Sequence, residues 1–169
     1  METPPQIAHR FREVMLDGTW IANTNFQHQL VPVTWRQAIR PVGPLNTIAR
    51  LTFHINYYIA GVLNVLQGGD LEIRDRYSFD LPPITRAEQW QQLRSDLLRN
   101  AETFAAEVEK MPPEKLEAPF VQEKYGTYRR NLEGMIEHAY YHLGQISLIR
   151  KMIDGGFSVV PDTPDPEIV

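Results

Sequence analysis

The sequence contains no cysteine among its 169 residues. This excludes a disulfide scaffold, a zinc site built from thiolates and a cysteine nucleophile, so any thiol used in a reaction must come from a small molecule. No apolar run approaches the roughly 20 residues that a membrane helix needs. The first five residues include two prolines and an acid, unlike a secretory signal. We therefore expect a cytoplasmic protein with no membrane partner.

Clustered positive charge is also missing. The chain has 17 basic and 21 acidic residues, a formal net charge of −4, and the two signs are mixed along the sequence. The densest basic spot is Arg129-Arg130, and two arginines at a helix start are typical of a solvated helix face. Binding to a nucleic-acid backbone needs clustered lysine and arginine, so we expect no nucleic-acid partner.

Length and composition fit one domain. A chain of 169 residues with a hydrophobic fraction of 43% can bury one full core but is short for two. We assign residues 1–156 to this domain. The stretch 157–169, which alternates prolines with acids, is predicted to be a mobile tail.

Four segments have apolar residues at helical spacing, and strand signals are scarce. The first opens at Thr3 with a T-x-x-Q capping box, and its apolar pattern continues to Ala22. The second and fourth end at paired glycines, which are strong helix stops. The predicted helices run from about 3 to 22, 44 to 67, 85 to 110 and 127 to 154. This pattern predicts an all-α fold, an up-and-down antiparallel four-helix bundle.

Three histidines occupy matching positions on two of these helices. His138 and His142 are four residues apart, so their side chains stand one above the other on one face. At about 100° per residue, this face lies about a quarter turn from the apolar stripe of its helix. His54 has the same offset on the second predicted helix. If the two helices pack through their stripes, the three imidazoles meet as a site for one divalent metal ion.

The spacing alone leaves other interpretations open. Helical histidines four residues apart are frequent, and each could instead be a half-buried side chain with a satisfied hydrogen bond. His138 is followed by Ala139, and Glu137 is predicted to face solvent, so the H-E-x-x-H motif of metallopeptidases is absent. A peptidase of that class is not expected. His9 and His28 have no partner at a ligand spacing, and we expect both at the surface.

Two segments resemble the histidine motifs of a known family. Residues 137–146, EHAYYHLGQI, and residues 51–55, LTFHI, are similar to those of the DinB-like superfamily, which includes the YfiT-like metal-dependent enzymes. The resemblance extends over nearly the whole chain. It implies an up-and-down four-helix bundle that binds nickel or zinc through His54, His138 and His142.

The resemblance implies less about the reaction. Characterised relatives include S-transferases that use bacillithiol, mycothiol or glutathione, and a maleylpyruvate isomerase that depends on a thiol. The sequence around the motifs, at 46–49 and 126–128, is most similar to an uncharacterised branch. The family resemblance therefore implies an enzyme of thiol S-transferase or hydrolase type that acts on a small-molecule substrate, with a low-molecular-weight thiol as one candidate cofactor. It also implies a homodimer.

Three imidazole ligands leave a coordination position for water or substrate, as in catalytic sites. Helical spacing places four side chains where they could orient these ligands: Tyr58, Asn131, Tyr141 and Gln145. The aromatic loop around 77–79 could close over the site or pack against the bundle. Two other hypotheses stay open, a non-catalytic dimeric bundle with a structural or incidental metal, and a metal-free helical interaction module.

Overall fold

The computed structural model describes residues 2–156, and the predicted tail at 157–169 lies outside this range. The described chain has six α-helices and no strand, so the predicted all-α class is confirmed. None of the described helices combines the length and the apolar character that crossing a membrane requires. The helices are α1 (Pro4–Met15), α2 (Phe26–Leu30), α3 (Trp35–Ala38), α4 (Ile48–Leu66), α5 (Ala87–Glu109) and α6 (Tyr128–Asp154).

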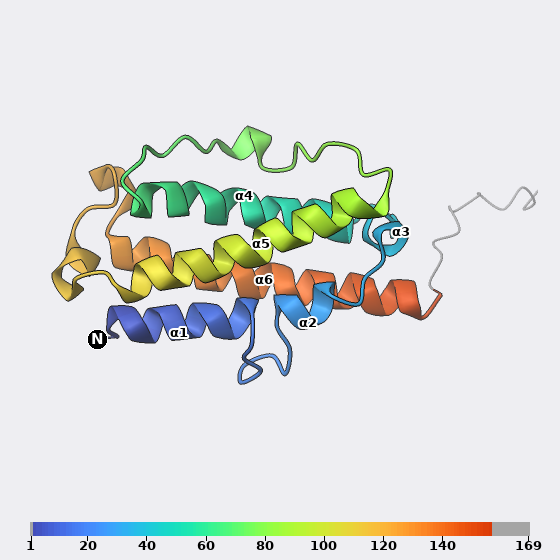
Figure 1. Cartoon of the computed structure of the whole chain (residues 1–169), viewed down its shortest axis with the longest axis horizontal. Helices are drawn as coiled ribbons and strands as arrows, with labels where there is room; N and C mark the ends of the chain where they lie inside the picture. The colour runs from blue at the N-terminus through green and yellow to red at the C-terminus, as the bar shows by residue number, and fades with distance from the viewer. Residues whose placement is uncertain (1, 157–169) are drawn as a thin grey trace, which may run out of the picture.

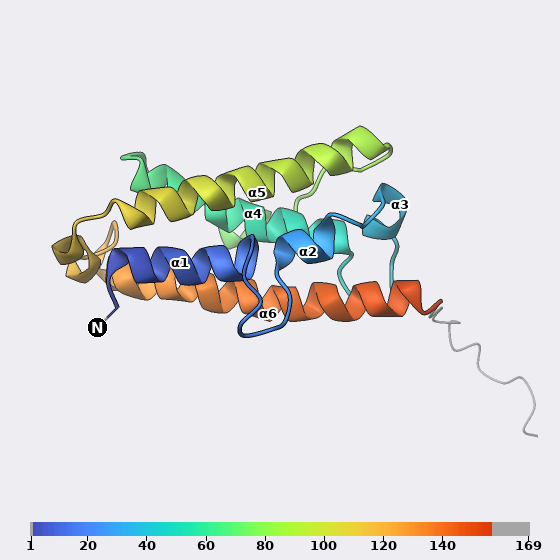
Figure 2. The same cartoon turned by 60° about the horizontal axis from the view of Figure 1, so that its bottom comes forward.

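The four longest helices lie side by side around one core (Figures 1 and 2). Both α1 and α4 pack against α5 and α6. The apolar stripes of the helices face inward, and the rings of Phe11 on α1 and Phe104 on α5 meet with their centroids 4.4 Å apart. The short helix α3 lies at one end of this core, and just before it the Val33 carbonyl accepts a hydrogen bond from the Trp90 indole N–H at 2.7 Å.

Threonine caps set where the two histidine-bearing helices begin. The Thr47 hydroxyl accepts a hydrogen bond from the Arg50 amide at the start of α4, and the Thr127 hydroxyl accepts one from the Arg130 amide at the start of α6. Each cap satisfies an amide that has no partner within its helix. The predicted capping box at Thr3 is also present.

The first predicted helix is too long. The structure ends α1 at Met15, and Ile21, which the pattern placed on an apolar stripe, is 65% exposed. The cause is Asn25, a buried side chain whose amide donates to the Gly18 carbonyl while its oxygen caps α2. Because these hydrogen bonds stabilise a turn, the chain forms two short helices between residues 23 and 43 instead of a helix tail.

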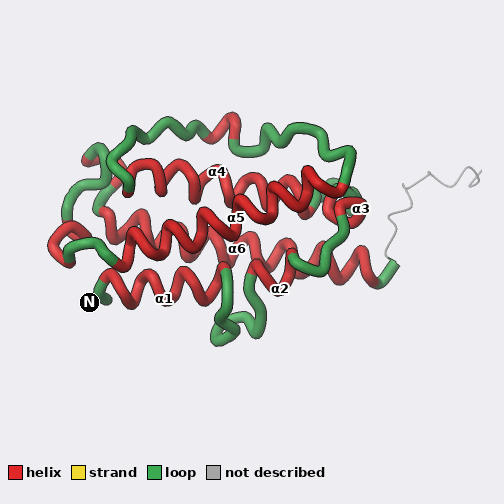
Figure 3. The backbone as a smooth tube through the Cα atoms, in the orientation of Figure 1, coloured by secondary structure: helices red, strands yellow, loops and turns green. Residues whose placement is uncertain are grey.

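The connection between α4 and α5, residues 68–86, forms a strap that runs along α4 (Figure 3). Polar side chains of α4 fix it: the Tyr57 hydroxyl accepts from the Arg74 amide at 2.8 Å and donates to its carbonyl, and the Asn64 amide donates to the Asp70 carbonyl. The strap is therefore an ordered wall beside the second predicted helix and not a free loop.

Candidate metal centre

The three predicted histidines come together between α4 and α6. His54 projects from α4, and His138 and His142 project from consecutive turns of α6. His54 is 7% exposed and His142 is 6% exposed, whereas His138 is half-buried. The quarter-turn offset explains this placement, because the apolar stripes of α4 and α6 enter the core and leave the histidines at the junction of the two helices.

The ring nitrogens converge on one point. The Nε2 atom of His138 lies 3.1 Å from Nε2 of His54 and 2.9 Å from Nε2 of His142. One nitrogen from each of the three rings lies within 4.8 Å of the other two. The predicted geometry of the triad is therefore present, and the three side chains could hold a metal ion.

Hydrogen bonds alone do not account for this convergence. A neutral imidazole nitrogen carries either one proton or one lone pair, so Nε2 of His138 cannot make two well-directed bonds to two other nitrogens. Ligands about 2.0–2.1 Å from a shared ion, at angles between 90° and tetrahedral, are about 2.9–3.4 Å apart. The two short nitrogen–nitrogen distances in the triad, 2.9 and 3.1 Å, fit that range. A divalent cation thus fits the donor set.

Burial favours the neutral form of all three rings. It lowers the pKa of His54 to about 4, and repulsion from His142 acts in the same direction. Burial also lowers the pKa of His138 to about 4, with contributions from His142 and His54. The pKa of His142 is lowered by burial as well, although its hydrogen bond to Gln145 opposes the change. At neutral pH the rings therefore keep the lone pairs that a ligand needs.

Two of the four predicted supporting residues lie where they can act on the histidines. Gln145 Oε1 is 2.7 Å from Nδ1 of His142, so the Nδ1–H donates to it and Nε2 is left free to bind. The Tyr58 ring contacts both His54 and His138 edge-on, with centroids 5.0 and 5.3 Å away. Its hydroxyl donates to the Asp75 carboxylate of the strap at 2.8 Å.

The other two supporting residues have different surroundings. The Asn131 amide donates to the backbone carbonyls of Tyr125 and Thr127. Asn131 itself lies about two helical turns from His138. Tyr141 touches the edge of His142, but its side chain is 64% exposed. Helical spacing places both residues on the histidine-bearing side of α6, but it does not determine their hydrogen bonds.

The strap supplies contacts that helical periodicity could not identify. The ring of Phe79 stacks on His54 with centroids 4.0 Å apart, and the Arg50 guanidinium lies 5.5 Å from the centre of the same ring. Of the two alternatives for the aromatic loop, the structure places Phe79 over the site and leaves Tyr77 42% exposed. The predicted surface positions of His9 and His28 are confirmed.

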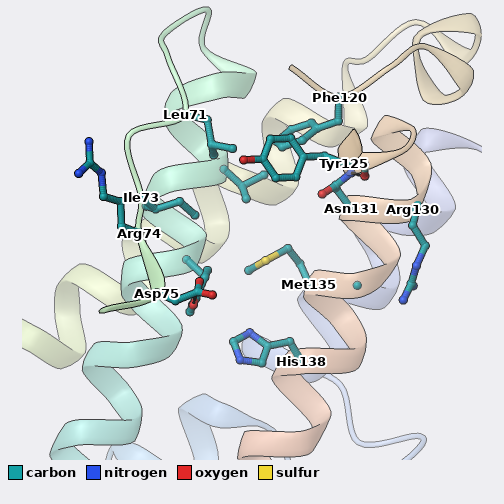
Figure 4. Close-up of a pocket in the computed structure, with 13 residues that line it drawn as sticks. Leu71, Ile73, Arg74, Asp75, Phe120, Tyr125, Arg130, Asn131, Met135 and His138 are labelled. Atoms are coloured by element: carbon teal, nitrogen blue, oxygen red, sulfur yellow. Dashed lines mark hydrogen bonds between the residues drawn. The ribbon is translucent and has the colours of Figure 1, made fainter. Parts of the chain in front are cut away.

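A cavity of about 710 Å³ opens beside the triad. It lies between α4, α6 and the strap, with His138 at one end (Figure 4). Met135 and His138 point into it from α6, and Asp75 faces them from the strap. A volume of several hundred Å³ is typical of a small-molecule site. The triad thus borders, through His138, a space that a ligand could fill.

These observations define a class, an all-helical protein with three convergent histidines beside a cavity. A family model described as the DinB superfamily matches residues 30–146, which include all three histidines. The chain belongs to the DinB superfamily, as the sequence motifs predicted. Comparison with curated proteins and with solved structures gives no significant match.

Proposed function

We propose that this protein is a metal-dependent enzyme, of thiol S-transferase or hydrolase type, that acts on a small molecule. The observation that carries the proposal is the convergence of three imidazole nitrogens, one of which belongs to His138 at one end of the cavity. The proposed scaffold is an up-and-down antiparallel four-helix bundle made by the long helices, with α2 continuing the line of α1 (Figure 1).

His54, His138 and His142 would hold the ion. Imidazole suits nickel and zinc, and both are compatible with this donor set. When bound, such an ion would act as a Lewis acid that lowers the pKa of a water or of a low-molecular-weight thiol. The chain has no cysteine, so in a transferase reaction the thiol would be a second small molecule.

Asp75 is the carboxylate best placed to take up a proton. It lies in the cavity wall and faces His138 across the space (Figure 4). Burial raises the pKa of Tyr58, and the hydrogen bond to Asp75 acts in the same direction, so the phenol stays protonated and continues to donate. Tyr58 would hold one carboxylate oxygen in place while the other faces the cavity and accepts a proton from the bound nucleophile.

A second candidate is a non-catalytic homodimer with a structural metal. Tyr141 and Leu148 are 64% and 56% exposed, and they lie seven residues apart on one face of α6, where a second copy could cover them. The second candidate requires a dimer in solution, whereas the first is compatible with a monomer or a dimer. Light scattering at micromolar concentration tests the dimer, and a monomer mass contradicts it.

The metal itself is tested first. Protein purified without a histidine tag should contain about one equivalent of nickel or zinc by mass spectrometry of the metals. The His138→Ala variant should lose it, whereas His28→Ala, at an exposed histidine, should retain it. Less than half an equivalent in the wild type, unchanged by His138→Ala, would contradict the site.

Activity is then tested with metal-loaded protein. A matrix of thiols (bacillithiol, mycothiol, glutathione, cysteine) and electrophiles, with a parallel set of esters and amides, separates a transferase from a hydrolase. We expect turnover of at least one combination, and a decrease of about 10²-fold or more in Asp75→Asn with the metal retained. If every combination stays at the buffer rate, the structural role is favoured.

A further inference from the structure

The walls of the cavity are mostly apolar. On α4 and α6 the lining includes Val62 and Met135, and Phe120 closes the end away from the triad. All three are less than 10% exposed in the protein as a whole, so packing fixes their positions and each presents a small apolar area to the space. Leu71 and Ile73 of the strap complete this wall. A ligand that fills the space would exchange water for hydrocarbon contacts.

The charged residues near the cavity are not arranged to bind an anion inside it. The Arg130 guanidinium contacts both oxygens of Glu137, at 3.0 and 3.1 Å. The Arg74 side chain points away from the cavity, as Figure 4 shows. The charged group that does face the interior is the Asp75 carboxylate. A negatively charged ligand body would therefore lose water without gaining a counter-charge.

The length of the cavity follows from the residues that line α6. Asn131, Met135 and His138 all contribute to the wall. At 1.5 Å per residue, the seven steps from Asn131 to His138 span about 10 Å. Gly134 lies within this span, and a Cβ added there would have only the Nη1 atom of Arg130 within 4.0 Å. The absence of a side chain at 134 thus leaves part of the space open.

We propose that the substrate has an extended, uncharged and apolar body about 10 Å long, which lies along α6 between the strap and Gly134 with its reacting group at His138. This inference rests on the proposed function, since it assigns the substrate class of the same site. The body contributes affinity through apolar contacts, and the polar chemistry stays at the histidine end.

Hydroxamates of different length test the proposal, because their common head group binds a metal and their tails differ. Acetohydroxamate, octanohydroxamate and the monohydroxamate of suberic acid are titrated into zinc-loaded full-length protein by calorimetry. At about fourfold per buried methylene, six additional methylenes should tighten binding by at least about 100-fold. The suberate compound has the same length but a terminal carboxylate, and should bind at least about tenfold more weakly than octanohydroxamate.

Two leucine variants on the same helix provide the structural control. Gly134→Leu should fill the cavity and reduce octanohydroxamate binding at least about tenfold, with acetohydroxamate binding unchanged within about twofold. Gly144→Leu, at an exposed position of α6 that does not line this cavity, should bind both compounds like the wild type. Equal affinity for the short and long tails in the wild type would overturn the proposal.

A metal-free measurement separates this inference from the proposed function. The uncharged dye N-phenyl-1-naphthylamine should fluoresce with metal-free wild type and with Gly144→Leu, but not with Gly134→Leu. If the dye gives this result but acetohydroxamate does not bind zinc-loaded protein, the proposed metal chemistry is contradicted and the apolar site is supported. If acetohydroxamate binds but the dye does not, the metal site stands and the apolar substrate class is overturned.

Discussion

The ring of Phe79 lies parallel to the imidazole of His54, with centroids 4.0 Å apart and an angle of 13° between the planes. This contact joins the strap to the metal centre, because Phe79 belongs to the strap and His54 to α4. The stacked ring covers one side of the imidazole and so contributes to its burial, which is the main cause of the low pKa of His54.

Replacing Phe79 by alanine should therefore affect both the fold and the site. We expect Phe79→Ala to lower the free energy of unfolding by about 1–3 kcal/mol, as for a half-buried aromatic residue. Metal affinity should fall by about tenfold, since His54 loses a group that fixes its ring. Urea unfolding and competition with a chelator measure the two effects. Tyr77→Ala, at a more exposed position of the strap, is the control and should leave metal affinity unchanged.

Gln145 offers a test that does not disturb the core. Its oxygen accepts the Nδ1–H of His142 at 2.7 Å and so selects the tautomer that binds through Nε2. Gln145→Ala should weaken metal binding by about 10–100-fold, with the unfolding midpoint of the metal-free protein nearly unchanged. Gln145→Glu, which keeps an acceptor, should restore most of the affinity. If alanine and glutamate behave alike in the chelator competition, Gln145 does not orient His142.

The histidine centre was largely predictable from sequence because its geometry follows helical periodicity. The fixed rotation per residue sets the angle between His54 and the apolar stripe of α4, and between the two other histidines and the apolar stripe of α6. The three imidazoles therefore meet if the two stripes pack against each other. Gln145 is three residues from His142 on the same face and was found by the same rule. Long helices with clear caps make such predictions possible.

The contacts made by the strap could not be predicted in this way. Phe79 and Asp75 lie in an aperiodic segment whose path depends on hydrogen bonds to Tyr57 and Asn64 of α4, and no periodic pattern encodes those partners. The end of α1 was misjudged for a related reason. The buried polar contacts of Asn25, with the Gly18 carbonyl seven residues away and the His28 amide three residues away, override the apolar spacing that extended the predicted helix.

The stability of the metal-free protein should depend on pH below neutrality. Because the pKa values of His54 and His138 in the folded protein are lowered to about 4, the unfolded chain takes up protons first as the pH falls. The free energy of unfolding is therefore unaffected by protonation of these histidines above about pH 6.5, which is the pKa of histidine in an unfolded chain. It decreases progressively as the pH falls from there toward 4.

Urea midpoints of chelator-treated protein between pH 7 and 4 measure this effect. The His138→Gln variant should show a shallower decline than the wild type, because one buried imidazole is removed and repulsion among the others is reduced. His28→Gln makes the same chemical change at an exposed position, and its urea midpoint should decline with falling pH as steeply as that of the wild type. Identical slopes in all three proteins would mean that the triad is not buried in the neutral form.

Two glycines in equivalent helical settings should respond oppositely to alanine. At Gly61 on α4, an added Cβ would lie 2.2 Å from Cγ2 of Ile73 in the strap, and that branched methyl group cannot swing away as a flexible chain end could. At Gly134 on α6 the nearest atom is 4.0 Å away. Alanine favours a helix over glycine by about 1 kcal/mol at either position, so Gly134→Ala should stabilise the protein by up to that amount.

Gly61→Ala should instead destabilise the protein by about 1–3 kcal/mol, because overpacking against Ile73 exceeds the gain in helix propensity. The displaced strap carries Asp75 and Phe79, so metal and hydroxamate affinities should fall together with stability. Denaturant unfolding and calorimetry on both variants measure these changes. A stabilised Gly61→Ala variant with unchanged ligand binding would show that the strap moves freely, and that its contacts with α4 do not position the site.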